Sequence, residues 1–334
     1  MLLRCAVTAP QDPVAAFWQA WPSLREALNE ALERRDFGDL PQRIGALTEA
    51  IHPRLEWELG PGQRATHAFA LSAAGDMSLR HLTERWVRDA PTDDPVWEFH
   101  PARQPRPGFG LRLGDVELAA DAMEAAFEVD PGTERVHVRV FHPAFAELDE
   151  RGRGTGTFLM LDGLLGEDGV ERWIGAVQPA TSRPEGAQPF AELAAAVQAL
   201  EAEATGERWA LLEGQPDGVR TIVAVNRALK RVDHPLHTHR CELRVALEAP
   251  TAEGLPGADE DEVLGELEDR LRRDLGEHAA YLGRLTGGGA RTFVLYAPPH
   301  GPAAAAVAAF CDGLERASAT WEADPRWEFA AQFR

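Results

Sequence analysis

The densest group of potential metal ligands in the sequence lies between residues 233 and 241. It contains Asp233, His234, His237, His239 and Cys241. If this segment is a strand, His237, His239 and Cys241 alternate along it and their side chains share one face. Imidazole nitrogen and thiolate are the ligands that zinc takes in proteins. These three residues are therefore the candidate metal ligands.

A structural role explains the same residues. The face that carries Cys241 continues into Leu243, Val245 and Leu247, which is typical of a buried strand face. Cys241 would then pack as a small hydrophobic residue, and the histidines would only close the end of the sheet. A strand supplies two or three ligands at most, so the others would have to come from elsewhere. We favour the structural role, predict no cofactor, and keep zinc as the alternative.

A glycine-rich stretch is the second candidate for chemistry. The run Arg151-Gly-Arg-Gly-Thr-Gly156 precedes a predicted helix that begins at Thr157. It resembles the Arg-x-x-Gly-x-Gly loop with which acetyltransferases of the GNAT type hold the pyrophosphate of acetyl-CoA, so Arg151, Gly154 and Gly156 are candidate cofactor-binding residues. However, the preceding strand ends near Phe141, too far away for that loop. A surface loop is the favoured interpretation, and no hydrolase, metalloprotease, P-loop or dinucleotide signature is present.

The elements that would position these residues belong to a repeated module. Asp94-Pro-Val-Trp-Glu-Phe99 recurs as Asp324-Pro-Arg-Trp-Glu-Phe329, and each copy follows a helix, a hairpin and a second helix. With one strand added in front, this order is the split β-α-β pattern of a ferredoxin-like sandwich. We expect the repeated tryptophan to fill the core from the last strand.

These patterns predict an α+β protein with two domains, built as duplicated ferredoxin-like sandwiches in which antiparallel sheets carry helices on one face. The expected N-terminal domain spans residues 1–185, and its division into two submodules, 1–105 and 106–185, stays open. The middle segment, about 109–180, is expected to extend or complete the first sheet. Residues 186–205 are expected to form a linker helix, and residues 206–334 the C-terminal ferredoxin-like domain.

Composition restricts the partners. The formal net charge is −20, and no cluster of arginines stands free of neighbouring acids, which argues against nucleic-acid binding. The only lysine is Lys230, which follows no glycine-rich loop. Three cysteines far apart, without a signal peptide or an apolar segment of membrane-spanning length, predict a reduced, cytoplasmic protein with no membrane partner.

The C-terminal part resembles a known family. Trp209, Val225-Asn226, Gly254-Leu-Pro256, Gly283-Arg-Leu-Thr286 and Asp324-Pro-Arg-Trp327 resemble the bacterial family called domain of unknown function 695, over about residues 206–334. Members of that family often end in a half similar to the regulator of ribonuclease activity B proteins, which are ferredoxin-like and act by binding an enzyme. The resemblance implies a fold and a non-enzymatic role, and it implies no catalytic residues.

The sequence therefore predicts a cytoplasmic protein-binding or regulatory module whose partner is another protein, with a basic partner suited to the acidic surface. An immunity-type protein that neutralises a toxin is one alternative. An enzyme that uses a metal ion or an acyl-CoA is the other.

Overall fold

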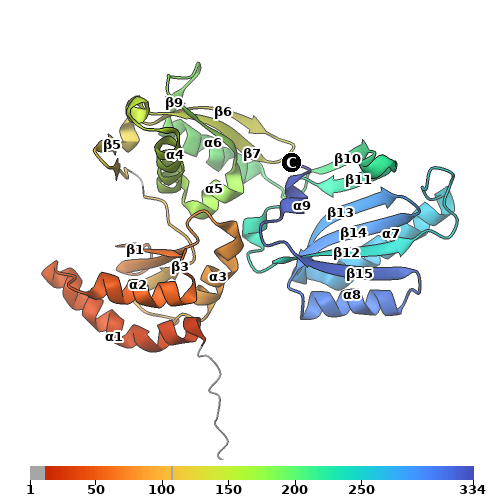
Figure 1. Ribbon diagram of the computed structural model, residues 1–334, viewed down its shortest axis with the longest axis horizontal. Helices are drawn as coiled ribbons and strands as arrows, with labels where there is room; N and C mark the ends of the chain where they lie inside the picture. Colours follow the sequence, from red (N-terminus) through yellow and green to blue (C-terminus); the bar gives the residue numbers. More distant parts are fainter. Residues whose placement is uncertain (1–11, 107) are drawn as a thin grey trace, which may run out of the picture. The chain divides into compact units, whose positions relative to one another are not determined.

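The computed structural model describes residues 12–106 and 108–334. The chain forms two compact units, residues 1–104 and residues 105–334. Each unit combines helices with sheets, which confirms the predicted α+β class (Figure 1). Within the described residues, no helix combines the length and the apolar character needed to cross a bilayer. Cys5 lies outside the described residues.

The first unit packs three helices on a small sheet. Its helices are α1 (Pro13–Arg34), α2 (Leu40–Ile51) and α3 (Arg80–Arg88), and its strands are β1 (Glu56–Pro61), β2 (His67–Ser72) and β3 (Trp97–His100). The sheet has the order β1-β2-β3, with β2 antiparallel to β1 and parallel to β3. Asp12 caps α1 by accepting the N–H of Val14 at 3.2 Å, and Pro13 occupies the first turn, where its missing N–H costs nothing.

Aromatic rings fill the core of this first unit. Phe17 meets Trp86 edge to face at a centroid distance of 5.3 Å, and Trp21 meets Trp97 in the same way at 5.6 Å. All four side chains are buried. Because each ring buries a large apolar area, α1, α3 and β3 are held together mainly by these contacts.

The middle segment forms a sheet of its own. Its strands are β4 (Leu111–Leu113), β5 (Val116–Leu118), β6 (Glu124–Asp130), β7 (Arg135–Phe141), β8 (Ile174–Ala180) and β9 (Gln188–Pro189), and its helices are α4 (Glu150–Leu165), α5 (Glu167–Trp173) and α6 (Phe190–Glu203). Strands β4 and β5 form a separate two-stranded sheet, and the other four strands have the order β8-β7-β6-β9, so the expectation that this segment extends the first sheet is wrong. The reason is that its buried strand residues, such as Val138, find partners in its own helices, including Leu161 of α4 and Leu193 of α6.

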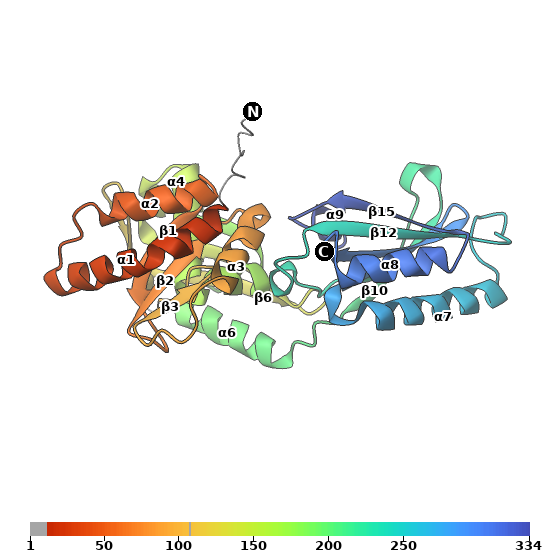
Figure 2. The same ribbon diagram turned by 90° about the horizontal axis from the view of Figure 1, so that it is seen from below.

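The C-terminal segment builds a six-stranded sheet with the order β10-β11-β13-β14-β12-β15. The strands are β10 (Trp209–Gly214), β11 (Thr221–Asn226), β12 (His239–Ala246), β13 (Ala280–Gly287), β14 (Ala290–Ala297) and β15 (Ala317–Ala323), and the helices are α7 (Ala258–Leu275), α8 (Pro302–Asp312) and α9 (Glu328–Ala331). Helices α7 and α8 lie side by side on one face of the sheet (Figure 2). Phe293 and Leu295 face these helices, whereas Val294 and Tyr296 belong to a separate cluster on the other face.

The predicted order of helix, hairpin, helix and strand is confirmed in both units, but the predicted duplication of the whole sandwich is not. In the C-terminal sheet, β12 lies between β14 and β15, which gives the split β-α-β connectivity. In the first unit, β3 pairs directly with β2 instead. No described strand of that unit precedes α1 and could take the place of β12. The added strand would have to come from residues before α1, and residues 1–11 are not described.

The repeated hexapeptide has two different conformations. Trp97 opens β3, whereas Trp327 lies in the left-handed region (φ 55°, ψ 42°) just before α9, so its expected place on the last strand is wrong. The Asp324 carboxylate accepts the N–H groups of Glu328 and Phe329 and turns the chain out of the sheet. Trp327 is nevertheless fully buried, and its ring stacks on Tyr296 at 4.1 Å.

Candidate functional site

The three predicted metal ligands are not brought together. Cys241 is fully buried between the sheet and its helices, and His239 begins β12 with its Nδ1 at 3.0 Å from the Thr238 hydroxyl. The His237 ring instead stacks on His234 at 5.0 Å. Across residues 12–106 and 108–334, no three or more His, Cys, Asp or Glu side chains are grouped so that they could hold a metal ion.

Burial also keeps both Cys241 and His237 uncharged at neutral pH. Burial raises the pKa of the Cys241 thiol to about 12, so at neutral pH the thiol is protonated. Burial, together with the neighbouring His234 and His278, lowers the pKa of His237 to about 4. Both groups are therefore neutral, and Cys241 is in addition fully enclosed, as expected of a core residue.

The glycine-rich stretch is helical. Arg151, Gly154 and Gly156 all lie inside α4, which begins at Glu150, so the prediction of a loop that ends before Thr157 is wrong. The reason is the N-cap, since Asp149 accepts the N–H of Gly152 at 2.7 Å and starts the helix earlier. A carboxylate therefore occupies the helix N-terminus where the pyrophosphate of a candidate acyl-CoA cofactor would bind.

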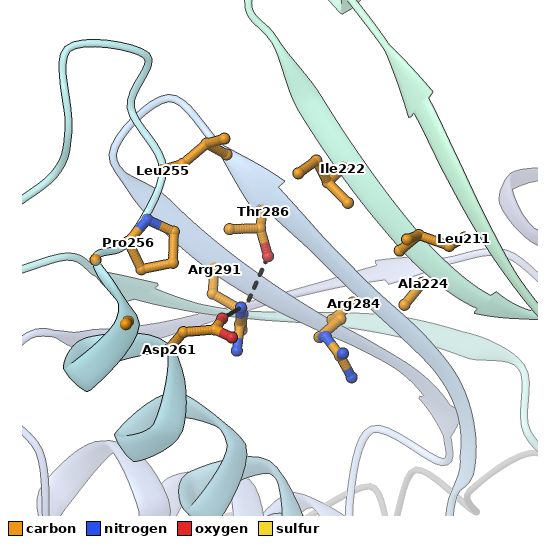
Figure 3. A pocket seen from close by; sticks show the side chains of 11 residues that line it. Leu211, Ile222, Ala224, Leu255, Pro256, Asp261, Arg284, Thr286 and Arg291 are labelled. Carbon is orange, nitrogen blue, oxygen red and sulfur yellow. Dashed lines mark hydrogen bonds and ion pairs between the residues drawn. The ribbon is translucent and has the colours of Figure 1, made fainter.

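A cavity of about 350 Å³ lies on the helix-covered face of the C-terminal sheet (Figure 3). Hairpin β10–β11 forms one wall with Leu211, Ile222 and Ala224. The loop before α7 forms the opposite wall with Leu255 and Pro256. Both walls are aliphatic, so the cavity can accept an apolar side chain.

The floor of the cavity is polar but internally paired. Arg291 is buried, and its guanidinium donates to the Thr286 hydroxyl at 3.0 Å and to the Asp261 carboxylate of α7. Arg284 donates to both oxygens of the Glu268 carboxylate, at 3.0 and 2.8 Å. Because each guanidinium already has a carboxylate partner, the floor fixes the shape of the cavity and carries no free charge for an ionic ligand.

A second side chain, Tyr281, also holds the Glu268 carboxylate at the floor of the cavity. The Tyr281 hydroxyl donates to Glu268 at 3.0 Å, and burial together with this carboxylate raises the pKa of Tyr281. The phenol therefore stays protonated and keeps donating. Trp209 lies beside the Tyr281 ring at 6.3 Å, so β10 is tied to the same polar group through aromatic packing.

Apolar side chains are unusually exposed on β10, next to the cavity. Leu211 is 75% exposed, Trp209 42% and Leu212 39%. Val219, in the turn that follows, is also exposed. Because β10 is the first strand of the sheet, one of its edges pairs with no other strand among the described residues. An apolar edge strand beside an apolar cavity is the feature of this unit best suited to binding another chain.

Sequence reasoning placed a strand at Trp209-Ala-Leu-Leu212 but assigned it no function. The available signal was the run of four apolar residues, because a half-buried strand normally alternates apolar and polar positions. The cavity could not be inferred in the same way. Its walls join a hairpin to a loop at residues 255–256, and only the pairing of β11 with β13 brings them to one place.

Comparison with protein-family models finds that residues 207–333 match the family described as "Family of unknown function (DUF695)". This agrees with the resemblance drawn from the sequence. The matched segment contains all six strands of the C-terminal sheet, and with them the cavity and the exposed edge. No curated protein and no solved structure matches the chain.

Proposed function

We propose that this protein is a non-enzymatic binding module that holds a partner protein at the β10 edge and the adjoining cavity. The observation that carries the proposal is the exposure of Leu211, Trp209 and Leu212 on an unpaired edge strand. Exposing these side chains to water is unfavourable by roughly 25 cal/mol for each Å² of apolar surface. A bound partner would recover that free energy.

Charge indicates the kind of partner. The chain has a formal net charge of −20, which attracts a basic surface over a distance limited by ionic screening. We therefore propose a basic protein as the partner, and neither nucleic acid nor a membrane. Raising the salt concentration should weaken the complex mainly by slowing association.

The connectivity of the C-terminal sheet supports a ferredoxin-like assignment for this part of the chain. Strands β12, β13, β14 and β15 with helices α7 and α8 follow the split β-α-β order, and hairpin β10–β11 extends the sheet at one edge. Similarity to the regulator of ribonuclease activity B proteins stays an expectation from the sequence. The two described cysteines, Cys241 and Cys311, are free thiols, which suits the proposed cytoplasmic location.

Photocrosslinking in the cell tests the proposal. A photoreactive amino acid is placed at Leu211, and in a matched control at Ser318, which is exposed on the opposite edge strand β15. We expect a defined crosslinked partner from position 211 only. Leu211→Asp should then abolish binding of that purified partner, and Ser318→Asp should leave it unchanged. If no crosslink forms at 211, or both positions give the same products, the proposed function is wrong.

A further inference from the structure

We infer that the partner contributes an extended segment that pairs antiparallel with β10, adds a seventh strand to the sheet, and carries basic residues at its amino end. This inference rests on the proposed function and names the form of the recognised segment. Three features support it, namely the backbone groups of β10, its side chains, and the charges at the β10–β11 turn.

Along its outer edge, β10 pairs with no strand of residues 12–106 and 108–334. The Arg227 N–H donates to the Arg208 carbonyl at 2.9 Å, and the register continues with Trp209 opposite Asn226. In an antiparallel ladder, bonded and non-bonded pairs alternate, so the N–H and C=O groups of Trp209, Leu211 and Glu213 point away from β11. These three alternate residues therefore offer N–H donors and C=O acceptors to an incoming strand.

Antiparallel pairing follows the rest of the sheet. Every strand pair in this sheet is antiparallel. Antiparallel ladders are also slightly more stable per residue than parallel ones. A seventh strand in this orientation would continue the existing twist and register.

The side chains of the two edges differ. The other edge strand, β15, exposes Ser318, Thr320, Glu322 and Ala323, and this mainly polar set, with its one charge, discourages pairing with another chain. Strand β10 has Trp209 and Leu211 on the face of the cavity instead. Leu211 also lines the cavity, so an apolar side chain of the added strand would lie beside Leu211 and reach the cavity mouth.

The charges give the added strand a direction. At the turn end of β10, Arg220 is shared between the carboxylates of Glu213 and Glu253, which leaves one carboxylate in excess. Asp217, exposed in the turn, adds another negative charge. An antiparallel strand has its amino end at this turn, so basic residues belong at that end.

The test uses full-length protein and synthetic peptides as probes. The first peptide has two arginines at its amino end, followed by alternating valine and threonine. The second replaces the arginines with glutamates, and the third carries N-methyl groups on alternate amides of the arginine peptide. Binding is measured by fluorescence anisotropy up to about 1 mM peptide, since a generic segment of this size should bind weakly.

We expect the arginine peptide to bind at least about fivefold more tightly than the glutamate peptide. The N-methylated peptide should not bind the unchanged protein, and the arginine peptide should not bind the Leu211→Asp variant. The Ser318→Asp variant should bind the arginine peptide as the unchanged protein does. Hydrogen exchange should slow at the amides of Trp209, Leu211 and Glu213 when the arginine peptide is bound. Absence of binding, or binding that tolerates N-methylation, overturns the inference.

The outcomes separate this inference from the proposed function. A partner crosslinked at position 211, combined with no binding of the arginine peptide and no protection of β10 amides, keeps the function and rejects strand addition. Absence of both the crosslink and peptide binding rejects the two together. Peptide binding that survives Leu211→Asp places the ligand elsewhere and rejects the inference.

Discussion

The Glu98 carboxylate is enclosed by the backbone of the β1–β2 turn. It accepts the N–H groups of Gln63, Arg64 and Ala65 at 2.7 to 2.9 Å, and the His100 ring nitrogen lies at 2.9 Å. Burial alone would raise the pKa of Glu98, but these hydrogen bonds favour the charged form more strongly and lower the pKa to about 2. A single side chain of the repeated hexapeptide thus holds the tip of a hairpin.

Replacing Glu98 should therefore destabilise the first unit in a pH-dependent way. We expect Glu98→Gln to lower the free energy of unfolding by about 1–3 kcal/mol at neutral pH. A carboxyl group whose pKa is lower in the folded state stabilises that state at pH values above its unfolded pKa, near 4.5. This stabilisation is lost as the pH falls towards about 2. Urea unfolding at several pH values measures this. The exposed Glu49→Gln is the control, and equal effects of both substitutions would contradict the assignment.

Lys230 is the second residue with a defined electrostatic role. Its ammonium group is buried and donates to the carbonyls of Thr133 and Glu134 at 2.6 and 3.0 Å, with the Trp173 ring 5.7 Å away. Burial, followed by the nearby guanidinium of Arg135, lowers its pKa to about 7. The only lysine of the chain therefore joins the middle segment to the C-terminal one.

The sign of the resulting pH dependence is fixed. Between pH 7 and 10.5, the unfolded chain binds a proton at Lys230 that the folded chain has lost, so stability should rise with pH. The slope from this one group reaches about 1.4 kcal/mol per pH unit at most. Lys230→Met should remove the slope, and the exposed Arg273→Met should retain it. Urea unfolding measures the free energy of unfolding at each pH. If it changes equally with pH in Lys230→Met and in the unchanged protein, Lys230 does not titrate between pH 7 and 10.5.

At the scale of single elements, α4 offers a matched pair of glycines. A Cβ added at Gly154 would meet nothing within 4 Å, whereas one added at Gly156 would lie 2.7 Å from the Cδ1 atom of Leu118, a fully buried side chain. Gly154→Ala should raise the free energy of unfolding by about 0.5–1 kcal/mol, because alanine loses less entropy in a helix. Gly156→Ala should lower it by about 1–3 kcal/mol through overpacking. Thermal unfolding of the two variants tests these opposite expectations. Equal shifts of the melting temperature would mean that both glycines lie in open surroundings.

Some elements could be predicted from the sequence and others could not. Strand β12 was predicted correctly, because Cys241, Leu243 and Val245 alternate with Arg240 and Arg244, and burial follows that period. The helix was predicted to begin at Thr157, and the first turns of α4 were mistaken for a loop, because three glycines hide the periodic signal there and the cap at Asp149 was not recognised. Trp327 was placed on a strand because the hexapeptide repeats, although its conformation depends on the distant Tyr296, whose hydroxyl donates to Asp324 at 2.7 Å.

The candidate site was less predictable than the elements that form it. The sequence gives β10 as a strand, but only the order of the whole sheet makes it an edge, and only tertiary packing opens the cavity beside Leu211. The candidate metal ligands lie apart for the complementary reason. Alternation correctly placed Cys241 on one face, but that face is covered by helices and the turn before β12 carries His237 away from it.

At the scale of the whole molecule, the family match and the compact unit have different boundaries. The match covers residues 207–333, whereas the unit begins at residue 105. Polar contacts cross the boundary of the match. Glu134 is buried in a left-handed conformation (φ 50°), accepts the N–H groups of Thr205 and Gly206 at 3.1 Å, and pairs with Arg208 at 3.0 Å. Arg231, also buried, pairs with Glu171 of α5.

These contacts predict that the matched segment does not have its full stability alone. A fragment of residues 206–334 lacks Glu134 and Glu171, so Arg208 and Arg231 lose their carboxylate partners, and Lys230 loses the two carbonyls to which it donates. We expect it to melt below a fragment of residues 105–334 in thermal unfolding. The Arg208→Ala substitution distinguishes loss of the contact with Glu134 from the general effect of a shorter fragment. It should cost about 1–3 kcal/mol in the longer fragment, where a buried carboxylate loses its partner, and nearly nothing in the shorter one. An equal effect of Arg208→Ala in both fragments would mean that the middle segment does not stabilise the C-terminal sheet through Glu134.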